Sequence, residues 1–326
     1  MRYAIYAGGE ESNLASLEHI KALVQNHIAR QPGRSPYRTQ ADGLILLQSE
    51  PEAQPTHMMH QPALCVVVQG AKWTAFGEQR LDYRAGQAMI TSLETPGFSQ
   101  VVEGGDGEPY YGLIVQLNLP ILREVYEALG RPPIKPSGRT PDAIVVDLDE
   151  RVLGCVRRML EALAHADGVP ILYPGLMREL CYLLLSSPYA SALARPLVSS
   201  RETRGLIGAV RRIQHHYDQP LPLSQLARES GYSLFTFHRK FKALTSMTPL
   251  AYQKRLRLIE ARRLMIAEQM SAEEAGFKVG YASPSQFNRE YARMFQASPR
   301  KDVRTQGKPT ARQRAGKPGP DGHDEN

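Results

Sequence analysis

Residues 223–241 read Leu223-Ser-Gln-Leu-Ala-Arg-Glu-Ser-Gly-Tyr-Ser233-Leu-Phe-Thr-Phe-His-Arg-Lys-Phe241. Residues 271–291 read Ser271-Ala-Glu-Glu-Ala-Gly-Phe-Lys-Val-Gly-Tyr-Ala-Ser283-Pro-Ser-Gln-Phe-Asn-Arg-Glu-Tyr291. Both stretches contain a short helical pattern, a Gly-Tyr turn, a Ser in a capping position, and a second helical pattern with Arg between aromatic residues. Their turns lie about fifty residues apart. The repeat predicts two helix-turn-helix units, which place their second helices in the major groove of DNA.

Local signals indicate where these helices end and begin. Gly231 and Gly280 supply the positive φ that closes a short helix before a sharp turn. Ser233 and Ser283 then stand where a side-chain oxygen accepts from the free N–H groups of the next helix.

Capping boxes add to these signals. Ser271 with Glu274 predicts one at the start of the second unit. Gln286 predicts another with the Ser three residues before it, and Pro284 suits the first helical position.

One segment joins the two units. Thr248-Pro249 predicts a helix start, and no further Gly or Pro follows as far as Ala267. A helix over 249–267 is about 28 Å long at about 1.5 Å per residue. Because one turn of DNA spans roughly 34 Å, this length suits two recognition helices in successive major-groove faces.

The first residues of each second helix are the expected base contacts, because these positions face the groove. The candidates are Leu234, Phe235, Thr236, His238 and Arg239 in the first unit, and Ser285, Gln286, Asn288 and Arg289 in the second. Either Arg binds guanine or phosphate, and the amide of Gln286 serves either an adenine edge or the helix cap.

Other basic residues around these helices are candidates for phosphate contacts or for solvated surface. They are Lys240, Lys242, Lys254, Arg255, Arg300 and Lys301. The charge distribution supports this assignment: residues 1–200 carry 17 Lys and Arg against 21 Asp and Glu, whereas residues 201–306 carry 19 against 9. A mildly acidic part is therefore followed by a basic part suited to a phosphate backbone.

The segment from about residue 203 to 305 resembles the DNA-binding domain of the AraC/XylS family of bacterial transcription regulators. The matching residues are Leu226-Ala227, Ser233, Arg239, Phe241, Thr248-Pro249, Tyr252, Arg257, Ala261, Leu264, Val279-Gly280-Tyr281, Ser283, Phe287, Arg289 and Pro299. Phe277-Lys278 and Tyr291 depart from the usual pattern. The resemblance implies a cytoplasmic, sequence-specific regulator that binds promoter DNA and activates transcription through RNA polymerase.

The first two hundred residues alternate short apolar runs with turn residues, as in an antiparallel barrel. Strands are expected at 44–48, 64–69, 72–76, 79–83, 88–92, 98–102 and 111–117. Helices are expected at 12–29, 119–129, 149–166 and 174–186. The apolar stripe of the 149–166 helix suits either its own barrel or a dimer seam.

The runs 61–72, 82–86 and 109–112 resemble the amino-terminal domain of one AraC/XylS subgroup. This resemblance implies a cupin-like jelly roll that binds an unknown small-molecule effector, with helices behind it for a homodimer. The predicted fold class is therefore α+β, a barrel with flanking helices followed by an all-α domain. The expected division is 1–37 as a lead-in, 38–195 as the sensing domain, 196–306 as the DNA-binding domain and 307–326 as a disordered tail.

The effector pocket stays unassigned, because an error of one residue in a strand exchanges its faces. Inward-pointing polar or aromatic residues would line it. Candidates are Gln69, Trp73, Tyr83, Met89, Phe98 and Tyr111.

Chemistry-bearing groups are sparse. His57-Met-Met-His60 lacks the three or four convergent ligands of a metal site. The three Cys have no CxxC spacing, and Cys65 is either a small apolar core residue or a reactive sensor thiol. No phosphate loop or nucleophile elbow is present, so we expect no enzyme, no cofactor and no metal.

Three alternatives remain open. The chain is an effector-independent DNA-binding dimer, a cupin-type metalloenzyme fused to a DNA-binding domain, or a DNA-repair methyl acceptor. The last of these requires a cysteine-rich zinc module at the start, and the first 64 residues contain no Cys. No run reaches the 18 or more apolar residues of a membrane span.

Overall fold

The computed structural model describes residues 4–33, 35–105, 107–130, 143–194, 197 and 201–306. It divides into two compact units. The first runs to His215 and includes Leu221–Gln253, and the second contains His216–Pro220 and the chain from Lys254 onward. The predicted tail, 307–326, lies outside the described residues.

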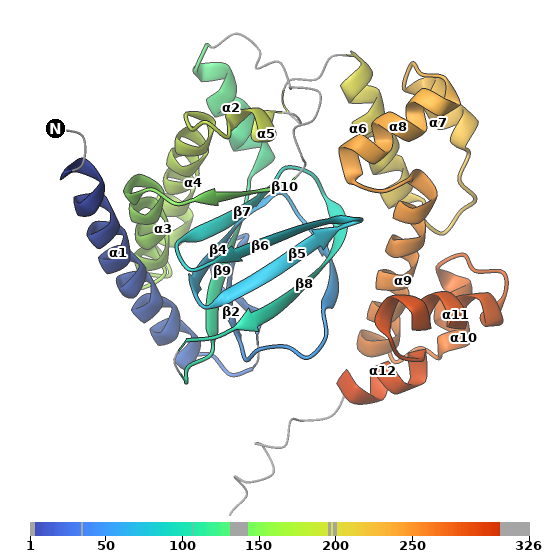
Figure 1. The fold of residues 1–326 in the computed structure, drawn as a ribbon, viewed down its shortest axis with the longest axis horizontal. Helices are drawn as coiled ribbons and strands as arrows, with labels where there is room; N and C mark the ends of the chain where they lie inside the picture. The colour runs from blue at the N-terminus through green and yellow to red at the C-terminus, as the bar shows by residue number, and fades with distance from the viewer. Residues whose placement is uncertain are drawn as a thin grey trace, which may run out of the picture. The chain divides into compact units, whose positions relative to one another are not determined.

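The first unit contains two antiparallel sheets (Figure 1). The larger sheet has the order β1 (Tyr37–Arg38), β2 (Leu44–Ser49), β9 (Tyr110–Gln116), β4 (Ala63–Gln69), β7 (Gln87–Thr91) and β10 (Ala143–Asp147). The smaller sheet has the order β3 (Thr56–His60), β8 (Thr95–Glu103), β5 (Ala71–Phe76) and β6 (Gln79–Arg84).

Helices pack on one face of the larger sheet (Figure 1). They are α1 (Ala4–Ala29), α2 (Leu119–Ala128), α3 (Glu150–Ala162), α4 (Val169–Leu185) and α5 (Ala190–Ala194). Leu46, Leu64 and Leu113 of the sheet share a buried core with these helices. The other face of the sheet belongs to a smaller core with the second sheet, which includes Val67 and Tyr110.

The predicted fold class is confirmed, and all seven expected strands are present. β1, β3 and β10 were not predicted. The apolar stripe of α3 lies in the core beside the larger sheet, so it packs against its own barrel. α1 begins at Ala4, eight residues before the expected start, and α4 begins at Val169 and continues through Pro174.

The helical part of the chain contains two matched helix-turn-helix units. α6 (Arg201–His215) precedes α7 (Leu223–Glu229) and α8 (Leu234–Thr245), and α9 (Pro249–Ala267) precedes α10 (Ala272–Lys278), α11 (Pro284–Phe295) and α12 (Pro299–Gln306). α7 and α10 have 7 residues each, and α8 and α11 have 12 each. Because α9 has the predicted bounds, the expected linker helix is confirmed.

Each turn has the conformation that its glycine predicts. φ is 76° at Gly231 and 92° at Gly280. The next residue donates a backbone hydrogen bond across each turn, from Tyr232 to Ala227 at 2.9 Å and from Tyr281 to Gly276 at 3.0 Å. The two turns differ in their surroundings, because a side chain at 231 meets open space whereas one at 280 collides with the carbonyl of Asp218.

This difference predicts unequal costs for one substitution. Gly231→Ala should destabilise its unit by about 1–2 kcal/mol, because only the left-handed backbone is penalised. Gly280→Ala should destabilise its unit clearly more, because the backbone at Asp218 must also move to make room for the new methyl group. Hydrogen-exchange mass spectrometry of α7–α8 and α10–α11 measures both local effects, and equal losses of protection would contradict the packing at Gly280.

Candidate nucleic-acid interface

Helix α8 is oriented by its buried side. Phe237 and Phe241 are fully buried, and their ring centroids lie 5.6 Å apart. Ser233 caps the helix by accepting from the Thr236 amide at 3.3 Å. The opposite side of the helix must therefore face outward.

The structure places the first set of predicted base contacts on this outward side. Leu234, Phe235 and Arg239 are exposed, and Thr236 and His238 are half-buried. Phe235 is 78% exposed, which is unusual for a side chain of its size and leaves its ring available to a partner. A hydrophobic ring next to an Arg suits a thymine methyl beside a guanine or phosphate.

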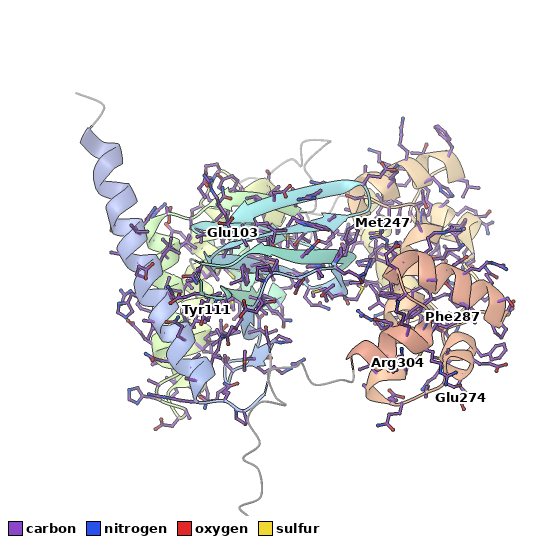
Figure 2. All side chains as sticks on the ribbon, turned by 60° about the horizontal axis from the view of Figure 1, so that its bottom comes forward. Glu103, Tyr111, Met247, Glu274, Phe287 and Arg304 are labelled. Atoms are coloured by element: carbon purple, nitrogen blue, oxygen red, sulfur yellow. The ribbon has the colours of Figure 1, made fainter. Side chains whose placement is uncertain are left out.

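Helix α11 repeats the arrangement. Phe287, labelled in Figure 2, and Tyr291 are buried, with ring centroids 5.5 Å apart. Ser285, Gln286, Asn288 and Arg289 are all exposed. All four base contacts predicted in the second helix-turn-helix unit are therefore exposed.

The caps of the second unit differ from each other. Ser271 and Glu274 form the predicted capping box in full, at 2.9 and 3.2 Å. At α11 the Ser283 hydroxyl accepts from the Gln286 amide at 3.4 Å. The Gln286 side chain donates to Glu290 at 3.2 Å, so the second box is half made and this amide lies along the exposed side of α11.

Arg257 of α9 stabilises the second helix-turn-helix unit. Its guanidinium donates to four backbone carbonyls, those of Tyr217, Asp218, Gln219 and Gly280, at 2.6, 3.1, 3.0 and 2.8 Å. It therefore ties the segment before α7 to the turn that introduces α11. Burial lowers the pKa of Arg257, because it removes water from the charged guanidinium. The four carbonyl acceptors replace part of that lost hydration.

The contacts of Tyr291 account for a tyrosine at this position, which departs from the usual family pattern. Its hydroxyl donates to Asp302 of α12 at 2.7 Å. The same buried carboxylate accepts a bidentate pair from Arg262 of α9 at 2.7 and 2.9 Å. The hydroxyl that Phe would lack thus completes a charged network beneath α11.

The phosphate candidates fall into two environments. Lys240, Arg300 and Lys301 are exposed. For the other three, Lys242 pairs with Glu78 at 3.3 Å, Lys254 pairs with Glu290 at 2.7 Å, and burial lowers the pKa of Arg255. The sequence pattern could not separate these environments.

Within the first compact unit, one backbone oxygen of the barrel is bonded to two of the helices around the first helix-turn-helix. The carbonyl of Glu94, between β7 and β8, accepts from Gln214 Nε2 of α6 at 3.1 Å and from the Tyr252 hydroxyl of α9 at 2.8 Å. Gln214 Nε2 lies 2.8 Å from the same hydroxyl. These three groups form a closed triangle that includes β7–β8, α6 and α9.

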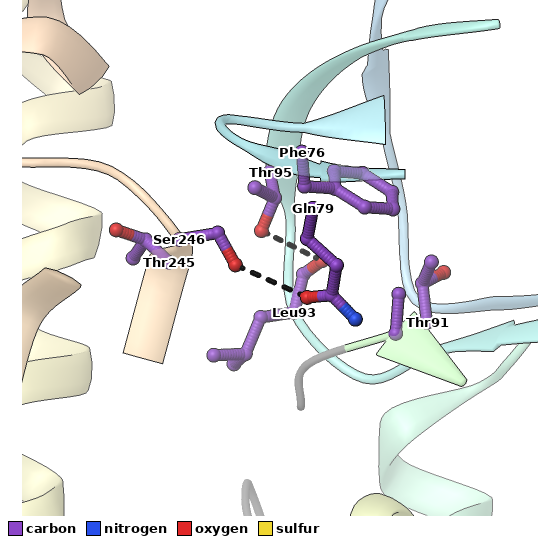
Figure 3. A pocket seen from close by; sticks show the side chains of 8 residues that line it. Phe76, Gln79, Thr91, Leu93, Thr95, Thr245 and Ser246 are labelled. Atoms are coloured by element: carbon purple, nitrogen blue, oxygen red, sulfur yellow. Dashed lines mark hydrogen bonds between the residues drawn. The ribbon is translucent and has the colours of Figure 1, made fainter. Parts of the chain in front are cut away.

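A small pocket lies beside this contact (Figure 3). It is lined by Phe76, Gln79, Thr91, Leu93, Thr95, Ala143, Thr245 and Ser246. The Ser246 hydroxyl, at the end of α8, donates to Gln79 Oε1 at 3.4 Å. A side chain at Gly77 would collide with the Ser246 carbonyl, so the β5–β6 turn sits tightly against the α8–α9 turn.

The histidine pair does not converge. His57 stacks against Phe98 with centroids 5.2 Å apart, whereas His60 packs edge-on against Phe76 at 5.0 Å. Residues three apart on a strand face opposite sides, so the two rings cannot share one ion. Among the described residues, no cluster of three or more His, Cys, Asp or Glu is placed to hold a metal ion.

Two family models match the chain. Residues 40–192 match the AraC-type transcriptional regulator N-terminus, and residues 226–305 match a helix-turn-helix domain. The HTH-type transcriptional activator RhaS of Escherichia coli strain SE11 is 29% identical over 158 residues, which cover 48% of this chain and 56% of that protein. The chain thus spans about half the length of the curated relatives it matches.

A crystal structure of apo ToxT from Vibrio cholerae strain SCE256 has the same fold. The TM-score is 0.53 at 8% identity, with coverage of 82% of this chain and 98% of that one. Barrel and helix-turn-helix domain together define a class of transcriptional regulator. The chain belongs to the AraC/XylS family, with an AraC-type amino-terminal domain. No helix among the described residues has the length and apolar composition of a membrane span.

Arg257→Met should destabilise the second helix-turn-helix unit by about 2–3 kcal/mol, because four carbonyls, two of them partly buried, lose a charged donor. Hydrogen exchange in α10–α11 reports this loss. Arg263→Met on the same helix is the control: its ion pairs with Glu260 and Glu268 lie on the surface, and such pairs contribute about 0–1 kcal/mol. Similar effects of the two variants would contradict the role given to Arg257.

The thiols should react slowly in the folded protein. Burial raises the pKa of Cys65 to about 11 and that of Cys155 and Cys181 to about 12. A thiolate reacts and a thiol does not, so alkylation should rise roughly tenfold per pH unit from pH 7 to 10. Iodoacetamide labelling followed by mass spectrometry measures this. Labelling of Cys65 at pH 7 at the rate of free cysteine would favour the sensor interpretation.

Proposed function

We propose that this protein is a bacterial transcription regulator that binds two adjacent major-groove segments of promoter DNA through α8 and α11. The observation that carries the proposal is the pair of matched helices, each anchored by two buried aromatic rings and exposing most of the positions predicted to contact bases. The length of α9, about 28 Å, supports a spacing of one DNA turn.

Base contacts are proposed for Leu234, Phe235, Thr236, His238, Arg239, Ser285, Gln286, Asn288 and Arg289. Lys240, Arg300 and Lys301 are proposed for phosphates, because they are exposed. Lys242, Lys254 and Arg255 can serve DNA only by leaving or sharing the protein contacts described above.

The amino-terminal barrel is proposed to bind a small-molecule effector and to modulate the DNA-binding part, acting as a cytoplasmic activator that contacts RNA polymerase. Similarity to a transcriptional activator supports this role. The contact at Glu94 supplies a physical route, because any shift of the β7–β8 turn changes hydrogen bonds to both α6 and α9. A homodimer is part of the same proposal.

Arg239→Ala and Arg289→Ala should each weaken specific DNA binding by about 1–3 kcal/mol, or roughly five- to 150-fold. The probe is a duplex enriched from a random-sequence library by the full-length protein, and gel shift at fixed salt gives the affinity. Arg123→Ala, which removes an exposed Arg from α2 of the barrel domain, should bind like the parent. Unchanged affinity for the Arg239 and Arg289 double variant would refute the assignment, and failure to enrich any duplex would refute sequence-specific binding.

A further inference from the structure

The facing sides of the two sheets form a barrel interior that is mostly apolar. Its buried core contains Val67, Phe76, Tyr83, Met89, Val101, Tyr110 and Ala143, and Leu47, Cys65, Leu81 and Val145 pack against it. Of the six residues considered from sequence as pocket candidates, only Tyr83 and Met89 belong to this core. Trp73 and Phe98 pack edge-on against each other with centroids 5.5 Å apart and do not belong to it, and Tyr111 packs on the helix side.

One strand brings a cation into this interior. Lys72 of β5 lies opposite Tyr83 of β6 and Val101 of β8 in the sheet register. Its Nζ is 6.0 Å from the centroid of the Tyr83 ring and 5.7 Å from that of Tyr110. Thr74, two residues along the same face, is bonded to Tyr83 and Ser99 in a buried chain of hydroxyls at 2.9 and 2.8 Å.

The ammonium of Lys72 has no carboxylate within ion-pair distance among the described residues. Cys65 and, more weakly, Glu52 act on it electrostatically, and the carboxylate of Glu52 accepts from the Val101 amide at 3.3 Å. The Lys72 side chain is half-buried by area, yet burial lowers its pKa. The charge of Lys72 is therefore only partly hydrated.

His60 adds a second unsatisfied group. It is 8% exposed, and its Nε2 is buried without a hydrogen-bond partner in the described part of the chain. It packs on Phe76, a residue of the interior core. Burial, with a contribution from the charge of Lys72, lowers the pKa of His60 to about 3, so the ring is neutral at pH 7 and offers one nitrogen to a partner.

We propose that the barrel interior binds a small organic carboxylate, whose charge pairs with Lys72, whose second polar contact is His60, and whose apolar body packs on Phe76, Met89 and Val101. The inference rests on the proposed function, which assigns an effector to the barrel, and names the chemical class of that effector.

The chemistry favours an anion over a neutral ligand. An isolated ammonium in an apolar enclosure is costly, and a carboxylate at hydrogen-bond distance offsets that cost where a hydroxyl or amide oxygen does so far less. Buried polar groups are usually paired, and those left unpaired mark a missing partner. Two aromatic rings beside Lys72 hold the cation in place without neutralising it.

Isothermal titration of the full-length protein tests the inference with four carboxylates of graded size: hexanoate, octanoate, benzoate and 3-phenylpropionate. Each is compared with its own amide, which has the same shape and no charge. At least one carboxylate should bind about tenfold or more tightly than its amide. Lys72→Met should abolish that preference, and Lys72→Arg should retain part of it.

Lys21→Met is the matched control, because Lys21 pairs with Glu108 at 2.7 Å outside the barrel interior. It should retain the full preference for the carboxylate. Circular dichroism and thermal unfolding of each variant establish that it is folded, and Lys72→Met should be no less stable than the parent because it removes a buried charge.

The inference is overturned if no carboxylate of the set binds, if each binds like its amide, or if Lys72→Met keeps the preference. Gel shift on the same preparations separates this outcome from the proposed function. Loss of DNA binding with carboxylate binding intact would remove the regulator assignment alone, and the reverse result would remove only the carboxylate site.

Discussion

The burial of two aromatic side chains one helical turn apart determines the orientation of each recognition helix. Phe237 and Phe241 fix α8, and Phe287 and Tyr291 fix α11. A helix buried along one stripe has only one side left for solvent, and the polar and basic residues lie there. The groups available to DNA therefore follow from the hydrophobic effect acting on the opposite side of the same helix.

Much of this half of the molecule is predictable because its signals are local. Glycine at a left-handed turn, serine at a cap and proline at a first helical position act within a few residues, so the bounds of α9 and the exposed sets on α8 and α11 follow from sequence. What the pattern could not show is which cations the protein itself uses. Lys254 and Arg255 look alike in sequence, yet one pairs with Glu290 and the other is enclosed.

The barrel is less predictable because its contacts are long-range. β3, with the sequence Thr-His-Met-Met-His, lacks a run of branched residues, and it is a strand because β8 pairs with it across some forty residues. β10 likewise depends on β7. The side that each residue faces comes from this pairing, so neither Lys72 nor His60 could be placed in the interior before the register was known.

Two of the hydrogen bonds that join the barrel to α6 and α9 end on a main-chain oxygen, that of Glu94. Every amino acid has that atom, so replacing the side chain at 94 leaves the acceptor in place. Substitution of the side chain at this position consequently preserves the two hydrogen bonds, whereas a displacement of the β7–β8 turn breaks them. Side chains inside the barrel can therefore change without altering the hydrogen bonds that the Glu94 carbonyl accepts from α6 and α9.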